Sequence, residues 1–289
     1  MLSVSEAGID PVQRDEHEEL TVEPKKVLTI AGSDCSGGAG IQADLKTFQE
    51  RDVYGMSVVT VLVAMQPETW HHIVMPVPVD DIRAQLPTVF PGIGAAAVKT
   101  GMLPTAGIIE LVGSFLKDKK VEHLVVDPVM VCKGAGQPLF PENTAAMIKH
   151  LLPIAEVVTP NTFEAAQLSG MDEPETLEDL KENALHIQAH GTKNVIIKAA
   201  RIFPDKAVNL LYDGKEFTIV EKPKVNTAWT HGAGCSFSAC VTAELAKGAS
   251  VKEAFLTATE FVFAGLERSF PLNQFVGPIY HKALAKQGK

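Results

Sequence analysis

A glycine-rich turn near the C-terminal end of the chain leads directly into an apolar segment with helical spacing. The segment reads THGAGCSFSACVTAEL over residues 230–245, and Phe237, Val241 and Leu245 recur at about one helical turn. The first N–H groups of a helix have no partner within the helix, so this turn could bind an anion. Cys235 stands at the helix start, where we expect a lowered thiol pKa and a role as base or nucleophile.

The residues before Cys235 could complete an oxyanion site. Gly232, Ala233 and Gly234 directly precede the cysteine, and their N–H groups would gather at the mouth of the helix. His231 belongs to the same turn. The turn therefore predicts a reaction in which negative charge develops beside a thiol.

Polar residues also follow several apolar, strand-like segments. Asp34, Asp127 and Lys198 each come at the end of such a segment, and Asn161 with Glu164 follows another. Asp127 and Glu164 could hold Mg²⁺, which usually keeps several waters and binds one or two protein carboxylates. Taken singly, Asp34 could be a helix cap and Glu164 could serve only a helix dipole. A lysine that ends an apolar strand more often faces a ligand, because burying it unpaired is costly.

Other well-known sites are absent or weakly indicated. The segment GSDCSGGAGIQA at 32–43 fits a loose GxGxxG/A pattern, but the second strand-like segment ends Ala64-Met65-Gln66, without the acidic residue that would hold a ribose. A dinucleotide oxidoreductase would explain only this loop. The sequence contains no GxxxxGK[ST] motif for a P-loop and no HExxH motif for zinc.

The composition is that of a globular protein with an acidic balance. The 289 residues are 46% hydrophobic with a formal net charge of -9, which argues against binding nucleic acid or an anionic membrane. The four cysteines form no CxxC pair, so we expect a reducing cytoplasm. Residues 1–25 are acidic and are expected to form a solvated, disordered tail, and no apolar run reaches the roughly 18 residues of a membrane span.

Strand-like and helical segments alternate from residue 26 to the end. This order predicts a single three-layer αβα domain over 26–289 with a mostly parallel sheet, whose ligands bind at the carboxyl ends of the strands. The predicted strands are 26–32, 56–65, 96–102, 123–130, 156–161 and 194–200, with a hairpin of 208–213 and 216–221, and helices include 41–52, 105–119, 176–191 and 251–270.

The ordered motifs resemble one branch of the ribokinase-like superfamily, the hydroxymethylpyrimidine and pyridoxal kinases. LTIAGSD, GGAGIQADLKTF, YGMSV, AVKTGM, VVDPVM, VVTPN, VIIK and THGAGCSFSA follow one another from about residue 26 to residue 270. The resemblance implies transfer of a phosphoryl group from ATP, with Mg²⁺ and possible help from a monovalent cation, to a hydroxymethyl group on a small heteroaromatic ring. It also implies a homodimer, which is common among relatives.

The same resemblance implies a role for each matching residue. Cys235 takes the place of an aspartate base found in most of the superfamily, with Gly232, Ala233 and Gly234 holding the charge on the transferred group. Substrate is expected at Gly32, Asp34, Met65, His72, Met102 and Cys132, nucleotide at Asn161, Lys198 and His231, and metal at Asp127 and Glu164.

Departures from the pattern bear on the substrate. Pyrimidine kinases usually carry a glutamine that bonds the aminopyrimidine where this chain has Met65, which cannot form that bond. The segment DPVMVCKG with Cys132, and residues 274–278, resemble pyridoxal kinases that use two cysteines, one adding reversibly to the aldehyde. We therefore expect pyridoxal phosphorylation, with hydroxymethylpyrimidine phosphorylation or a dual activity as the alternative.

A further departure concerns the nucleotide. Relatives usually have two glycines after the strand-ending lysine, whereas this chain has Ala199 and Ala200. Their methyl groups could crowd the nucleotide, and a chain that binds a vitamin without turning it over would be the consequence if they did.

Overall fold

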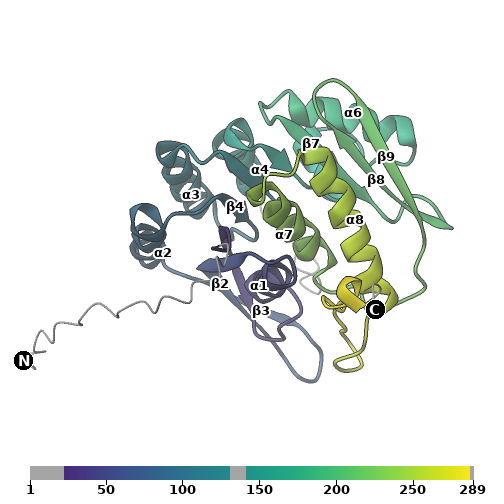
Figure 1. Cartoon of the computed structure of the whole chain (residues 1–289), viewed down its shortest axis with the longest axis horizontal. Coiled ribbons are helices and arrows are strands. Elements are labelled where there is room, and N and C mark those ends of the chain that lie inside the picture. The colour runs from purple at the N-terminus through teal and green to yellow at the C-terminus, as the bar shows by residue number, and fades with distance from the viewer. Residues whose placement is uncertain (1–22, 131–140, 287–289) are drawn as a thin grey trace, which may run out of the picture.

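The computed structural model describes residues 23–130 and 141–286, which are built around one central β-sheet. Within these residues the sheet has nine strands in the order β3-β2-β1-β4-β5-β6-β7-β8-β9 (Figure 1). The strands are β1 (Lys26–Asp34), β2 (Tyr54–Met65), β3 (His72–Pro76), β4 (Ala97–Thr100), β5 (His123–Val126), β6 (Val157–Val158), β7 (Asn194–Ala199), β8 (Lys206–Tyr212) and β9 (Phe217–Pro223). The six neighbouring strands β2, β1, β4, β5, β6 and β7 are parallel, whereas β3, β8 and β9 are antiparallel to β2, β7 and β8, respectively.

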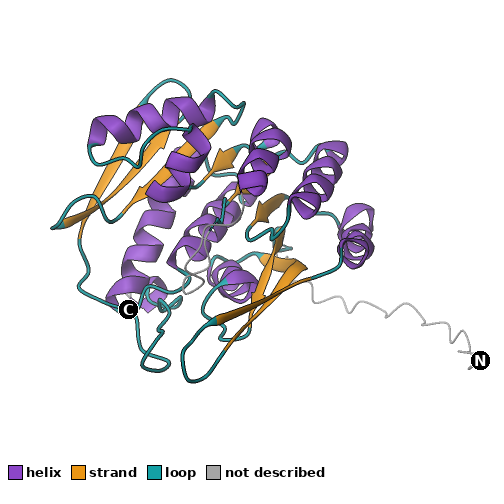
Figure 2. Ribbon diagram, turned by 180° about the vertical axis from the view of Figure 1, so that it is seen from behind, coloured by secondary structure: helices purple, strands orange, loops and turns teal. Residues whose placement is uncertain are grey.

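Helices cover both faces of the sheet. They are α1 (Gly40–Glu50), α2 (Val79–Pro87), α3 (Ala106–Lys119), α4 (Pro141–His150), α5 (Thr162–Ser169), α6 (Leu177–Gln188), α7 (Ala233–Ala246) and α8 (Val251–Glu267), with short segments η1 (Thr88–Ile93), η2 (Leu152–Ile154) and η3 (Leu284–Lys286). Side chains of α1, α7 and α8 pack on one face, and those of α2 to α6 pack on the other. Figure 2 shows the sheet from behind, with helices on both sides.

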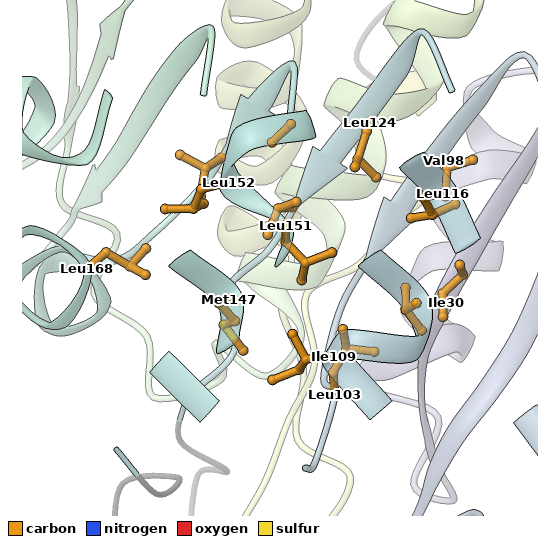
Figure 3. Close-up of a cluster of buried hydrophobic side chains, with 14 of the residues drawn as sticks. Ile30, Val98, Leu103, Ile109, Leu116, Leu124, Met147, Leu151, Leu152 and Leu168 are labelled. Carbon is orange, nitrogen blue, oxygen red and sulfur yellow. The ribbon is translucent and has the colours of Figure 1, made fainter. Parts of the chain in front are cut away.

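The core between the sheet and α2 to α6 explains why the central strands are apolar at nearly every position. Ile30, Val98 and Leu124 of three adjacent strands meet Ile109 of α3 and Met147 of α4 (Figure 3). The opposite side chains of the same strands pack on α1 and α7, so both faces are dry. The predicted mostly parallel sheet between two helical layers is thus confirmed.

The sequence prediction missed one strand. No strand was predicted between residues 66 and 95, but β3 begins at His72, whose side chain is only 9% exposed. β3 pairs antiparallel with β2, so that His72 lies opposite Met65. The predicted hairpin around Asp213 is confirmed by the β8–β9 pairing.

Two further expectations concern the acidic N-terminal segment and the length of the helices. The acidic segment 1–25 lies outside the described residues except for its last three, and β1 starts at Lys26 as predicted. In the described ranges, no helix has the length and apolar character that crossing a bilayer requires.

Candidate active site

A cavity of about 760 Å³ opens at the carboxyl ends of the parallel strands, beside the first turn of α7. This is the edge at which ligands bind in open α/β sheets. Every predicted site residue in the described part lines this cavity: Gly32, Asp34, Met65, His72, Met102, Asp127, Asn161, Glu164, Lys198, His231, Gly232, Ala233, Gly234 and Cys235. Cys132 lies outside the described residues.

The turn before α7 brings backbone donors to the cavity. Gly232 caps the helix with φ of 76°, and a side chain there would collide with the carbonyl of Gly38, so glycine is required. The N–H groups of Gly234 and Cys235 lie in the first turn and have no acceptor within the helix. The N–H of Ala233 instead donates to the Thr230 carbonyl at 3.3 Å, so this predicted anion donor is already engaged.

The Cys235 thiol does not have the lowered pKa expected from its place at a helix start. Burial raises the pKa of Cys235 to about 11, and the negative charges of Asp44 and Asp127 add to this effect. The Lys99 ammonium and an N–H from Gly40 act in the opposite direction but do not compensate. Burial therefore opposes the thiolate that a helix start favours.

Asp34 organises the loop between β1 and α1. Its Oδ1 accepts from the Ser36 N–H, and its Oδ2 accepts from the Ala39 N–H and lies 2.7 Å from His231 Nε2. Burial alone would raise the pKa of Asp34, but the bonds from His231 and Ser36 lower it to about 2. Asp34 is not the N-cap of α1, which is Ala39, but it accepts the Ala39 N–H and also lines the cavity. Its contact with substrate stays a prediction. His231 lies among the predicted substrate residues.

The end of the cavity near β2 and β3 is mostly apolar, with one buried polar atom that has no partner among the described residues. Met65 and Met102 pack together with Val61 and Val63 at the ends of β2 and β4. The pKa of the neighbouring His72 is lowered by burial and by the charge of His231, so its ring stays neutral. His72 Nδ1 is buried and has no hydrogen-bond partner among the described residues, and a polar substituent of a ligand could satisfy it.

Charged residues gather at the other end of the cavity. Lys198 Nζ lies 3.2 Å from Asp127 Oδ1, and Ser238 donates to Asp127 Oδ2 at 3.0 Å. Glu164 and Asn161 form a capping box at the start of α5, in which each side chain accepts from the other's N–H. Burial, together with the charge of Asp127, raises the pKa of Glu164 to about 7, although Lys198 opposes the shift.

These two carboxylates are the best candidates for holding a metal ion. No group of three or more His, Cys, Asp or Glu side chains in the described ranges is arranged to bind a metal. Asp127 and Glu164 repel each other, as the raised pKa of Glu164 shows, and a dication would relieve this repulsion. Two oxygen ligands completed by water and phosphate are the usual set for Mg²⁺, so the residues fit.

Several residues that the sequence analysis did not single out also line or support the cavity. Ser238 of α7 holds Asp127, and Lys99 of β4 forms a buried ion pair with Asp44 of α1. Asp44 could have been found, because it falls on the apolar stripe of its helix between Ile41 and Phe48. The outer part of the cavity is lined by Ala200, Arg201, Ala207, Asn209, Lys222, Val262, Phe263 and Leu266.

The two alanines after Lys198 differ in their surroundings. Ala199 is fully buried in the core between the sheet and α2 to α6, whereas Ala200 is exposed and lines the cavity. Only one of the two additional methyl groups therefore faces the space expected for nucleotide. Of the remaining cysteines in the described part, Cys35 is exposed and Cys240 is a core residue whose pKa burial raises to about 12.

Comparison with known proteins places this geometry in context. The model of one protein family, described as phosphomethylpyrimidine kinase, matches residues 34–280. A pyridoxine kinase of Bacillus subtilis is 57% identical over 261 residues, which cover 90% of this chain and 96% of the relative.

Solved structures agree with the sequence comparison. An ADP complex of Bacillus subtilis pyridoxal kinase is 56% identical, with a TM-score of 0.88 over 91% of this chain and 99% of that chain. The pyridoxal kinase of Staphylococcus aureus in complex with AMP-PCP and pyridoxal is 48% identical, with a TM-score of 0.85 over 90% of this chain and 94% of that chain.

Proposed function

We propose, since this chain belongs to the phosphomethylpyrimidine kinase family, that it transfers the γ-phosphoryl group of ATP to the hydroxymethyl group of pyridoxal and related B6 vitamers. The observation that carries the proposal is the position of Cys235, which stands at the start of α7 in one cavity with Asp127, Glu164 and Lys198. Relatives named as pyridoxine or pyridoxal kinases support it. A dinucleotide oxidoreductase would leave the charged end of the cavity unexplained.

The chemistry assigned to the chain's own residues is a proton transfer and a charge clamp. The Cys235 thiolate takes the proton of the substrate hydroxyl while the hydroxyl oxygen bonds to the γ-phosphorus of ATP. The bond between that phosphorus and the leaving oxygen of ADP breaks. The N–H groups of Gly234 and Cys235 face the charge on the transferred group. Lys198, whose ammonium lies beside Gly234, then neutralises part of the triphosphate charge.

Metal and nucleotide belong at the charged end of the cavity. Asp127 and Glu164 would hold Mg²⁺, which supplies charge neutralisation at the phosphates. Asn161 and His231 stay predicted nucleotide residues; the contact of His231 with Asp34 favours a place for it nearer the acceptor ring. A role for a monovalent cation stays a prediction from the family resemblance.

The acceptor ring belongs at the apolar end. Met65 and Met102 would contact its faces, and the neutral His72 could bond a ring hydroxyl through Nδ1, while Asp34 and Gly32 form the adjoining wall. Pyridoxal carries an aldehyde that a thiol can add to, and Cys132 is the proposed thiol. The alternative, a hydroxymethylpyrimidine kinase or a dual activity, is favoured by the description of the family model.

One experiment distinguishes the two substrates. ATP-dependent phosphorylation of pyridoxal and of hydroxymethylpyrimidine is measured side by side with the wild type and with Cys132→Ala. We expect pyridoxal to be preferred and the variant to lose mainly that substrate. A preference for the pyrimidine with Cys132 dispensable would instead identify a pyrimidine kinase, and ATP binding without turnover of either would leave a vitamin-binding protein.

A homodimer is proposed for the assembly. β3 is an edge strand, and Leu62, Ile73 and Met75 on the β2–β3 hairpin are each more than 40% exposed, which is unusual for a free sheet edge. Light scattering after size exclusion would give the mass in solution. A Met75→Lys variant should shift the protein to the monomer if this edge is the contact.

A further inference from the structure

A buried ion pair to which the proposed phosphoryl transfer assigns no role lies at the floor of the cavity. Lys99 Nζ is 2.9 Å from Asp44 Oδ2, and both side chains are fully buried. The Thr29 hydroxyl donates to the same oxygen at 2.7 Å, whereas Asp44 Oδ1 has no hydrogen-bond partner among the described residues. Replacing a buried ion pair by apolar residues is often neutral or stabilising, so stability alone is a weak reason for this one.

The pair faces the side of the sheet on which Cys235 lies. Ala97, two residues before Lys99 on β4, packs against Phe48 of α1 and Ala239 of α7, and alternate strand residues share a face. Lys99 also lines the same cavity as Cys235. A Cβ on Gly101 would lie 3.2 Å from Lys99 Nζ, so the glycine leaves room for the ammonium at the cavity floor.

The two charges act on Cys235 in opposite directions. The Lys99 ammonium is the charge that most lowers the pKa of the thiol against the effect of burial, and Asp44 raises that pKa. Burial would lower the pKa of Lys99 itself, but Asp44 and Cys235 raise it, so the ammonium stays charged. The pair therefore supplies a fixed positive charge near the sulfur, partly offset by its own counter-ion.

The other groups around the start of α7 come from the neighbouring elements. Asp127 after β5 opposes the thiolate, and Gly40 of α1 donates its N–H to the sulfur. Lys198 of β7 lies 3.4 Å from the position that a Cβ on Gly234 would take. His281 bonds to Ser236, and burial lowers its pKa to about 4, so it carries no charge at neutral pH.

We infer that Lys99 and Asp44 are positioning residues that set the charge of Cys235, with the Lys99 ammonium stabilising the thiolate and Asp44 holding the ammonium in place while limiting its effect. The inference rests on the proposed role of Cys235 as the base. It assigns the ionisation of that base to a pair on β4 and α1 rather than to the helix start alone.

Alkylation of Cys235 by iodoacetamide as a function of pH tests this without any kinase reaction. The full-length protein is alkylated, and the peptide carrying Cys235 is quantified by mass spectrometry. Lys99→Met should slow the reaction at a given pH by about tenfold, as expected for a shift of one pKa unit, because only the thiolate reacts. Asp44→Asn should speed it, because the ammonium then acts on the sulfur alone. Shifts in the same direction, or no shift, would overturn the inference.

Two further variants distinguish an effect of charge on Cys235 from an effect on folding. Lys99→Met with Asp44→Asn removes both charges and leaves no unpaired ion, and its alkylation rate should fall between those of the single variants. Arg51→Met breaks the 2.6 Å Arg51–Glu244 pair, which also joins α1 to α7 but near Cys240. It should lower the Tm and leave Cys235 alkylation unchanged. A slowing like that of Lys99→Met would show that any disturbance of the contact between α1 and α7 slows the reaction, and it would contradict the inference.

The proposed function can fail separately from this inference. If Cys235→Ala keeps full turnover, the base role is wrong whatever the alkylation shows. If Cys235→Ala is inactive while Lys99→Met alkylates like the wild type, only the role of the pair is lost. In a double-mutant cycle, Lys99→Met should reduce kcat in the wild type and have no further effect in Cys235→Ala.

Discussion

Lys198 Nζ lies 3.2 Å from Asp127 Oδ1, and the contact joins the ends of two strands, β7 and β5, that β6 separates in the sheet. Ser238 of α7 holds the other oxygen of the same carboxylate at 3.0 Å. Lys198 and Asp127 are thereby fixed at the charged end of the cavity. There the lysine would pair with a triphosphate and the carboxylate with its metal ion. The arrangement keeps both side chains paired until a ligand arrives.

Replacing this lysine should weaken ATP binding more than it slows the chemical step. Lys198→Met is expected to raise the KM for ATP by about 10- to 100-fold, because a hydrogen bond to a charged group contributes about 1.5–3 kcal/mol. Initial rates over a range of ATP concentrations measure the change. Lys206→Met is the matched control, since its pair with Glu221 lies on exposed parts of β8 and β9. An unchanged KM for ATP would exclude Lys198 from nucleotide binding.

The pH dependence of the reaction should follow Cys235. With its pKa raised to about 11, the thiolate fraction increases about tenfold for each pH unit below that value, so kcat/KM should rise with pH above neutrality. Cys235→Asp should flatten this rise, because a carboxylate is already ionised. Cys235→Ala should lower kcat by about 10²- to 10⁴-fold. A steep alkaline rise that persists in the aspartate variant would point to a different titrating group.

The Asp34–His231 contact should appear in acid stability. The pKa of Asp34 is lowered from 3.8 to about 2, so its charged form stabilises the fold above about pH 4, and this contribution is lost as the pH falls towards 2. The free-energy difference between wild type and Asp34→Asn should shrink by about 2 kcal/mol from about pH 5 to about pH 2. Urea unfolding at several pH values gives this difference. Asp80→Asn, which alters an exposed residue of α2, should show no such trend.

The parallel strands could be predicted because they are apolar at nearly every position. The helices α1, α3, α6, α7 and α8 could be predicted from the helical spacing of their apolar residues, whereas α2 and α4 were not predicted. β3 was missed because His72, its one buried residue, is polar and follows another histidine. Pro76 and Pro78 also end the apolar run shortly after it begins. Its short apolar run has no helical or alternating period to identify it. Only pairing with β2 makes it a strand.

The candidate site was also only partly predictable from the sequence. Polar residues at the carboxyl ends of the strands could be placed in one cavity from the topology alone, as Asp34, Asp127 and Lys198 show. The raised pKa of Cys235 could not be predicted, since a helix start favours the thiolate, burial opposes it, and the extent of burial is known only from the packed structure. Asp44 could be noticed on the apolar stripe of α1, but its pairing with Lys99 could not be predicted, because the two residues are separated by 55 positions and meet only where α1 packs on the sheet.

Substrate choice should respond to a single side chain at the apolar end of the cavity. Met65 lies at the end of β2 opposite His72 and presents no group that can bond the amidine edge of an aminopyrimidine. Met65→Gln should therefore raise kcat/KM for hydroxymethylpyrimidine by about 10-fold or more, the effect of one well-placed hydrogen bond, and lower it for pyridoxal, whose ring loses an apolar contact. Met65→Leu keeps the size and apolar character and should leave the ratio of the two substrates unchanged. If the glutamine and leucine variants change that ratio equally, packing at this position decides the preference and hydrogen bonding does not.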